Sequence, residues 1–88
     1  MNRNVIIIHP DDNVAVAVRE IAAGEHVEGV EGKNIKANSD IPQSHKVAIA
    51  EIEDGGTIIK YGEPVGVSKG IISPGDWVHT HNINTEEG

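Results

Sequence analysis

Four short polar segments contain most of the side chains in this sequence that could carry out chemistry. They hold four of the five histidines, two lysines and the only tyrosine. The segments are His9–Asn13, Ser44–Lys46, Lys60–Gly62 and His79–Asn82. Imidazole, ammonium, carboxylate and phenol groups bind metals, move protons and form hydrogen bonds to hydroxy acids. Their concentration in so small a chain favours an enzymatic role over a purely structural one.

Two of these segments have a spacing that indicates a particular kind of site. If His79 and His81 lie on a strand, they project to the same side, so both imidazoles could contact one divalent ion. The hydroxyl of Tyr61 could donate a hydrogen bond to a hydroxy acid. Each has a structural alternative, which is a polar strand edge for the two histidines and a core position for the tyrosine.

The other two segments lie where apolar strands end or begin. After the first apolar run, His9 and Asp12 would face either a substrate or, in a plain turn, the solvent. Pleat alternation would place His45 and Lys46 on opposite faces of the strand that they open. His45 is either a structural residue or a site residue whose pKa the neighbouring lysine lowers. His26 has no such partner and is interpreted as structural.

The elements that would position these segments are short strands. Val and Ile dominate the apolar positions, no segment keeps a 3.6-residue period, and ten glycines interrupt the chain. A helix over residues 13–21 is the alternative to a strand there, but the alternating valines and alanines of Val14–Val18 favour a strand with a closely packed alanine face. Strands are predicted near residues 4–9, 13–19, 33–37, 45–52, 57–61, 64–68 and 76–81.

Three segments share one spacing, in which Gly follows Ile by three residues and Val or Ile follows three residues later. They are residues 21–27, 52–58 and 72–78. Each is interpreted as a strand end, a turn whose Gly adopts positive φ, and a re-entering strand. Three such corners predict a compact all-β domain, and chance recurrence in a Gly-rich chain is the alternative.

Composition narrows the class of protein further. The 88 residues predict one domain, whose core must be built from Val, Ile and Ala because there is no Phe, one Trp and one Tyr. The absence of Cys excludes a disulfide framework and a thiolate metal site. A net charge of −7 argues against binding to nucleic acid. No signal peptide or membrane span is recognised, so a cytoplasmic location is expected. Residues 83–88 are predicted to be a loose tail or the start of a linker.

Four motifs occur in a fixed order between residues 5 and 83. They are His9-x-x-Asp12-Asn13, Ile41-Pro42-x-x-His45-Lys46, Lys60-Tyr61-Gly62-Glu63-Pro64 and His79-x-His81-Asn82. Together they resemble the N-terminal domain of the altronate/galactarate dehydratase family, which also occurs as the small subunit of (2R)-sulfolactate sulfo-lyase. The resemblance implies a small all-β SAF-type domain with a β-clip architecture. The family usually has Gly where this chain has Ser44, and Ser would cost roughly 1 kcal/mol if that position needs positive φ.

The resemblance implies a component of a dehydratase that removes water across C2 and C3 of a hexonate or hexarate. The product is a 2-keto-3-deoxy acid, and a divalent metal such as Fe²⁺ or Mn²⁺ assists. His45 would act as base or acid, Lys46 would hold the substrate carboxylate, and Tyr61 would donate to a hydroxyl. The remaining assignments are substrate binding by His9, Asp12 and Asn13, and metal contacts by His79 and His81.

A larger dehydratase subunit or domain is the expected partner, because it would complete the metal site and the substrate pocket. We do not expect the 88-residue chain to turn over substrate without it. Two alternatives remain open, which are the small subunit of a sulfolactate sulfo-lyase and a non-catalytic SAF module that binds sugars or assists assembly. The sequence also leaves the oligomeric state open, a homo-oligomer included.

Overall fold

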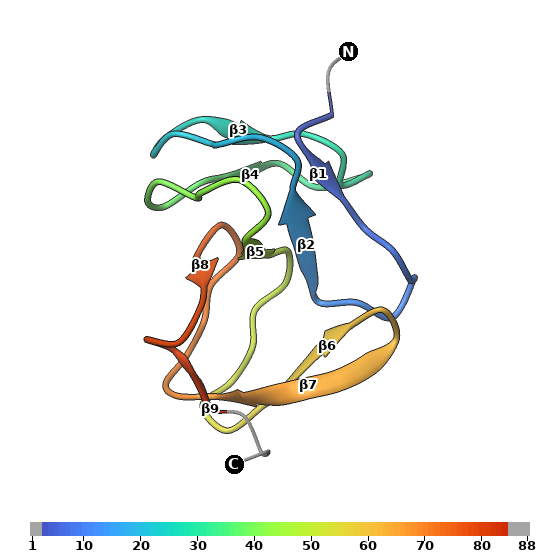
Figure 1. The fold of residues 1–88 in the computed structure, drawn as a ribbon, viewed down its shortest axis with the longest axis vertical. Coiled ribbons are helices and arrows are strands. Elements are labelled where there is room, and N and C mark those ends of the chain that lie inside the picture. The colour runs from blue at the N-terminus through green and yellow to red at the C-terminus, as the bar shows by residue number, and fades with distance from the viewer. Residues whose placement is uncertain (1–2, 85–88) are drawn as a thin grey trace.

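Every regular element in the described part of the chain is a β-strand. The computed structural model describes residues 3–84, and its strands form three antiparallel sheets (Figure 1). They are β1 (Val5–Ile6), β2 (Val14–Ala17), β3 (His26–Val27), β4 (Ile35–Lys36), β5 (Lys46–Ala48), β6 (Thr57–Lys60), β7 (Glu63–Ser68), β8 (Trp77–Val78) and β9 (Ile83–Asn84). The predicted all-β class is confirmed, and the segment after Asn13 is a strand rather than a helix. Among residues 3–84 there is no helix long and apolar enough to span a membrane.

The central sheet, with the order β1-β2-β5-β8, separates two hydrophobic cores. Its pleat directs Ala15 and Val47 into the first core and Val14 and Ala48 into the second. The β3–β4 pair adds side chains to the first core, and the β6-β7-β9 sheet adds side chains to the second. The predicted close packing of the alanine face is confirmed, because Ala15 and Ala17 are each 1% exposed.

The repeated corner occurs four times rather than three. The fourth copy is residues 41–47, where Ser44 stands at the position that Gly occupies in the others. In every copy, the fifth residue donates its N–H to the carbonyl of the second, as His45 does to Pro42 at 3.2 Å. The corners join in two pairs through isolated bridges between Ile21 and Ile41 and between Ile52 and Ile72. The φ angles at their fourth residues are 86° at Gly24, 71° at Ser44, 79° at Gly55 and 95° at Gly75.

The hydrogen bonds between paired corners explain why Ser44 adopts this conformation. Its N–H donates to the carbonyl of Ala17 at 2.8 Å, and the N–H of Gly24 donates in the same way to Ala37 at 2.8 Å. The same relation holds for Gly55 and Gly75 in the other pair. The network of four corners therefore imposes positive φ at each fourth residue, whatever side chain stands there. Ser44 therefore has the positive φ at which a serine was expected to lower stability.

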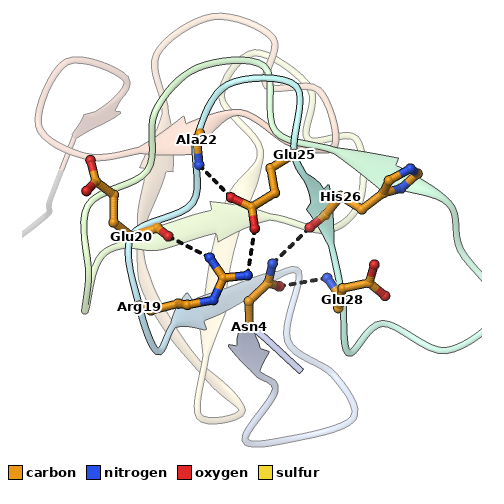
Figure 2. Close-up of polar contacts among 7 residues, drawn as sticks. All are labelled: Asn4, Arg19, Glu20, Ala22, Glu25, His26 and Glu28. Atoms are coloured by element: carbon orange, nitrogen blue, oxygen red, sulfur yellow. Dashed lines mark hydrogen bonds and ion pairs between the residues drawn. The ribbon is translucent and has the colours of Figure 1, made fainter. Parts of the chain in front are cut away.

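The side chains of Arg19 and Asn4 fasten the corner at residues 21–27 to the chain around it, as Figure 2 shows. Arg19 forms an ion pair with Glu25 at 2.6 Å, and the other carboxylate oxygen of Glu25 accepts the N–H of Ala22 at 2.9 Å. Asn4 is fully buried and donates to the carbonyl of His26 at 2.8 Å, while its own oxygen accepts the N–H of Glu28. Its polar atoms are satisfied by these bonds, so its burial is compatible with a stable core.

Several predicted strands are longer than those in the structure. The strand expected over residues 45–52 is limited to β5, and the one expected over residues 76–81 ends at Val78. The corners take over the backbone hydrogen bonds beyond these points. The predicted loose tail at residues 83–88 is wrong at its start, because Ile83 and Asn84 form β9 and pair with β7. Residues 85–88 lie outside the described residues.

Candidate functional site

Three of the predicted site histidines gather around the only tryptophan. We call His45, Trp77, His79 and His81 the imidazole–indole cluster. The ring of His79 stacks on the indole, with centroids 5.4 Å apart and planes 7° apart, and lies 4.7 Å from the ring of His45. The indole N–H of Trp77 donates to Nδ1 of His45 at 3.1 Å, and the ring of His81 lies 5.2 Å from the indole.

Strand register brings these rings together. The β5–β8 pair places Lys46 opposite Val78 and Val47 opposite Trp77. Continuing this register by one residue sets His45 beside His79, and the pleat puts Trp77 on the same face of the sheet. Sequence reasoning missed Trp77 as a member of the site. The available signal was an aromatic residue two positions before a predicted site histidine, on the same face of a predicted strand.

The strand geometry expected for the two C-terminal histidines is wrong. Residues 79–82 form a turn in which the N–H of Asn82 donates to the carbonyl of His79 at 3.0 Å. The side-chain oxygen of Asn82 accepts the N–H of His79 at 2.9 Å, and its amide donates to the carbonyl of Trp77 at 2.9 Å. An Asn that bonds its own turn in this way competes with strand extension. His79 and His81 are therefore held around the indole rather than side by side on a strand.

The residues present do not form a complete metal site. Within residues 3–84 there is no group of three or more His, Asp or Glu side chains placed to hold a metal ion. Divalent ions in proteins generally need at least three protein ligands. That His79 and His81 contact a metal stays a prediction. Such a site would need further ligands from another part of the enzyme.

Lys46 lies close enough to the cluster for its charge to act on His79, although the chain as a whole carries −7. Burial lowers the pKa of Lys46, and the charge of Lys60 lowers it further. Burial also lowers the pKa of His79, with added effects from the charges of His45, Lys46 and His81. These groups are therefore close enough to repel one another when protonated. A negatively charged ligand would relieve that repulsion.

A second group of predicted residues meets at the turn between β6 and β7. Tyr61 and Gly62 have φ angles of 60° and 74°, the pattern of a two-residue type I′ hairpin turn. The ring of His9 packs so closely on this turn that a Cβ added to Gly62 would lie 2.8 Å from Cδ2 of the imidazole. The ammonium of Lys60 lies 4.6 Å from the centre of the Tyr61 ring.

Asp12 holds this turn together. One carboxylate oxygen accepts the N–H of Gly62 at 2.8 Å, and the other accepts the N–H of His9 at 3.1 Å. Burial acts to raise the pKa of Asp12, but backbone hydrogen bonds from Gly62, Tyr61 and His9, together with the charge of His9, outweigh it and hold the pKa below its usual range. The carboxylate is thus kept ionised in order to bind backbone N–H groups.

Asn13 has a similar structural use. Its amide donates to the carbonyl of Thr57 at 2.9 Å, and its oxygen accepts the N–H of Ile59 at 2.8 Å. The side chains of Asp12 and Asn13 therefore tie the end of the first apolar run to β6 and its turn. The predicted contacts of these two residues with a substrate would require such bonds to open. Among residues 3–84, the Nε2 atom of His9 and the hydroxyl of Tyr61 have no hydrogen-bond partner.

Lys46 and Lys60 connect the two groups of residues, because the charge of one lowers the pKa of the other. Lys46 begins β5 and His45 directly precedes it, and the two side chains lie on opposite faces as predicted, with His45 in the imidazole–indole cluster and Lys46 opposite Val16 of β2. A depression of about 660 Å³ lies among other residues, which are Arg3, Ile7, Glu28, Gly29, Val30 and Glu31. None of the candidate residues lines it, so its chemistry is unrelated to theirs.

Comparison with known proteins identifies the family. The model of the altronate/galactarate dehydratase SAF domain matches residues 3–86. The chain belongs to this family. It is 39% identical to altronate dehydratase of Bacillus subtilis (strain 168) over 83 residues, which are 94% of the chain and 16% of that protein. The SAF domain thus spans about a sixth of the length of such relatives.

Two further relatives of the SAF domain are short proteins. Subunit alpha of (2R)-sulfolactate sulfo-lyase from Paracoccus pantotrophus is 44% identical over 52 residues, which are 59% of the chain and 78% of that subunit. Subunit alpha from Chromohalobacter salexigens is 30% identical over an alignment of 92 positions that covers 98% of each chain. The SAF domain therefore matches both the long dehydratases and a subunit of similar size to this chain. Both groups of relatives are named as lyases or dehydratases.

Proposed function

We propose that this chain is the SAF component of a sugar-acid dehydratase that eliminates water from a hexonate or hexarate to give a 2-keto-3-deoxy acid. The observation that carries the proposal is the imidazole–indole cluster. Lys46 lies on the opposite face of the sheet but is close enough for its charge to lower the pKa of His79. Together they provide imidazoles and a cationic side chain in a chain whose family is that of the altronate and galactarate dehydratases. The substrate would be a small hydroxy acid bearing a carboxylate.

The chemistry of this elimination matches the groups available. A base must remove the proton α to the carboxylate, a donor must assist the departing hydroxide, and a cation must balance the negative charge that develops. Lys46, with Lys60 close by, is suited to bind the carboxylate. The hydroxyl of Tyr61 is suited to donate to a substrate hydroxyl, because the αL turn holds this side chain at the surface, where it is 53% exposed.

The rest of the enzyme would close the site. None of the candidate residues lines the described depression, and the metal shell is incomplete, so a larger dehydratase subunit or domain is the partner that we propose. The divalent metal, Fe²⁺ or Mn²⁺, would then be held mainly by that partner.

An apolar patch on the central sheet indicates where this partner would rest. Ile6 and Val18 are 40% and 39% exposed, and Ile8 is 50% exposed. Ile6 pairs with Val16, and Val16 pairs with Lys46, so the patch lies on the face of the sheet that carries Lys46. A partner that covers these side chains would also bring its own groups to Lys46.

A second function is favoured by one specific observation. The sulfolactate sulfo-lyase subunit alpha from Chromohalobacter salexigens matches nearly the whole chain and is nearly the same length. A sulfo-lyase would use the same residues to release sulfite from sulfolactate instead of water from a sugar acid. The carboxylate-binding and proton-donating groups would keep their roles, and only the leaving group would differ.

Parallel incubations distinguish the two reactions. The complete enzyme that contains this chain is supplied with altronate, galactarate or (2R)-sulfolactate in the presence of Fe²⁺ or Mn²⁺, and both 2-keto-3-deoxy acid and sulfite are measured. The proposal expects keto-deoxy acid from a sugar acid and no sulfite. Sulfite release without keto-deoxy acid would favour the sulfo-lyase. Turnover that persists after this chain is removed would contradict any catalytic role and favour an assembly module.

A further inference from the structure

The hydrogen bond between Trp77 and His45 determines where the imidazole carries its proton. The indole nitrogen can only donate, whereas a neutral imidazole has one donor nitrogen and one acceptor nitrogen. Nδ1 of His45 lies 3.1 Å from the indole nitrogen and accepts its proton. Nδ1 must therefore hold a lone pair, and the imidazole proton must be on Nε2.

We propose that Trp77 is a positioning residue that fixes His45 as the neutral Nε2–H tautomer. The indole is well placed for this task because its own orientation is restrained. Its backbone pairs with Val47 in the central sheet, its ring is stacked on His79, and its carbonyl accepts the side-chain amide of Asn82. Because three contacts restrain the indole, its N–H can fix which of the two ring nitrogens of His45 stays unprotonated.

The same arrangement occurs in the second group of candidate residues. The backbone N–H of Asp11 donates to Nδ1 of His9 at 3.1 Å, so a neutral His9 also carries its proton on Nε2. The two imidazoles, the ammonium groups of Lys46 and Lys60 and the hydroxyl of Tyr61 then form a set of hydrogen-bond donors. Such a set is complementary to a ligand rich in anionic and hydroxyl oxygens.

The consequence for catalysis, which rests on the proposed function, is a narrower role for His45. Nε2 already bears a proton in this tautomer, so it cannot take the proton α to the carboxylate. It can donate a hydrogen bond to a substrate oxygen on which charge develops, without transferring the proton. A cationic imidazole would direct a second N–H at the indole N–H, and so would break the bond between them. The base must then be another group.

Nitrogen NMR on the 88-residue chain tests the proposal directly. At pH about 8.5, where histidines are neutral, we expect a scalar coupling across the hydrogen bond between Nε1 of Trp77 and Nδ1 of His45. The ¹⁵N shifts of His45 should show an unprotonated Nδ1 and a protonated Nε2. Trp77→Phe keeps an aromatic ring against His79 but removes the donor. In this variant the His45 shifts should move towards those of His26, whose side chain has no hydrogen bond among the described residues.

Two results would overturn the proposal. One is a protonated Nδ1 on His45 in the wild-type chain. The other is a set of His45 shifts that does not change in Trp77→Phe, when the amide spectrum shows that the variant is folded. If that variant does not fold, the coupling in the wild-type chain decides the question alone. The NMR experiment uses no substrate, so a negative result would not contradict the proposed function. An inactive enzyme, in turn, would not contradict the proposed tautomer of His45.

Discussion

The corners at residues 21–27 and 41–47 have the same backbone and different chemistry. They are joined by the Ile21–Ile41 bridge. Each has a residue with positive φ whose N–H donates to a carbonyl four residues before the other corner. The first corner is fastened by an ion pair between Arg19 and Glu25, and its His26 is exposed. The second carries a strained Ser44 and places His45 in the imidazole–indole cluster.

The strand that lies beside each corner accounts for this difference. β3 pairs with β4, where the residues opposite are Ile35 and Lys36. β5 pairs with β2 on one side and with β8 on the other, and β8 brings Trp77 and the histidines that follow it. A corner of this type is therefore a scaffold with no chemistry of its own. It becomes part of a candidate site where the neighbouring strand supplies reactive side chains.

The largest difference between the corners is expected in the reaction rate. His45→Ala in the complete enzyme should lower kcat by about 10²–10⁴-fold, the usual loss for a group that assists proton transfer or charge stabilisation. The matched variant His26→Ala, in the partner corner, should leave the rate unchanged and alter the free energy of unfolding by less than about 0.5 kcal/mol. Steady-state kinetics with circular dichroism measure both. If His45→Ala keeps more than a tenth of kcat, or loses rate only because it unfolds, His45 is not part of the catalytic machinery.

The next largest effect separates two corners that both contain Gly. A Cβ on Gly75 would lie 2.1 Å from the carbonyl oxygen of Lys36, whereas a Cβ on Gly24 would meet nothing within 4 Å. Gly24→Ala should cost about 1 kcal/mol, because only the positive φ is strained. Gly75→Ala adds a backbone collision and should cost roughly 2–4 kcal/mol in total. Urea unfolding compares the two variants, and equal costs would show that the corner at residues 72–78 relaxes freely.

Most of the fold could be predicted from the sequence, because Gly indicates positions with positive φ. Three corners were recognised from Gly at a fixed spacing, whereas the fourth was missed because Ser44 hides the same conformation. The Ile and Val positions of that corner were visible in the sequence, and the spacing alone would have found it. Strand lengths were overestimated because apolar alternation continues after the corners have taken over the backbone hydrogen bonds.

Less of the candidate site was accessible from the sequence. Pleat alternation gave the opposite faces of His45 and Lys46 correctly, since that relation is local. The turn after Val78 was missed, because the bonds that Asn82 makes to the backbone do not follow from the spacing of the histidines. The contact of Trp77 with His45 depends on the pairing of two strands that lie far apart in the chain. The residue pattern of a single sequence does not specify that pairing.

A reciprocal exchange tests whether Ser44 is a cost that the fold imposes. Relief of left-handed strain, roughly 1–2 kcal/mol, is partly offset by the extra freedom that Gly gives the unfolded chain, about 0.4–1 kcal/mol. Ser44→Gly should therefore stabilise the protein by about 0.5–1 kcal/mol, and Gly24→Ser should destabilise it by a similar amount. Thermal and urea unfolding give both values. A destabilised Ser44→Gly variant would show that the serine hydroxyl has a structural role that the hydrogen bonds described here do not include.

The smallest effect is expected from the ion pair that distinguishes the first corner. The Arg19 and Glu25 side chains are 51% and 33% exposed, so Arg19→Ala should lower the free energy of unfolding only slightly, and the loss should shrink in high salt. The hydrogen bond from Arg19, followed by that from the N–H of Ala22, lowers the pKa of Glu25. This contribution is present above the pKa of the unfolded carboxyl, about 4.3, and is lost as the pH falls through the folded value. The stabilities of wild type and Arg19→Ala should thus converge in acid. A large loss of stability that persists in high salt would mean that this pair, rather than the backbone network, holds the corner in place.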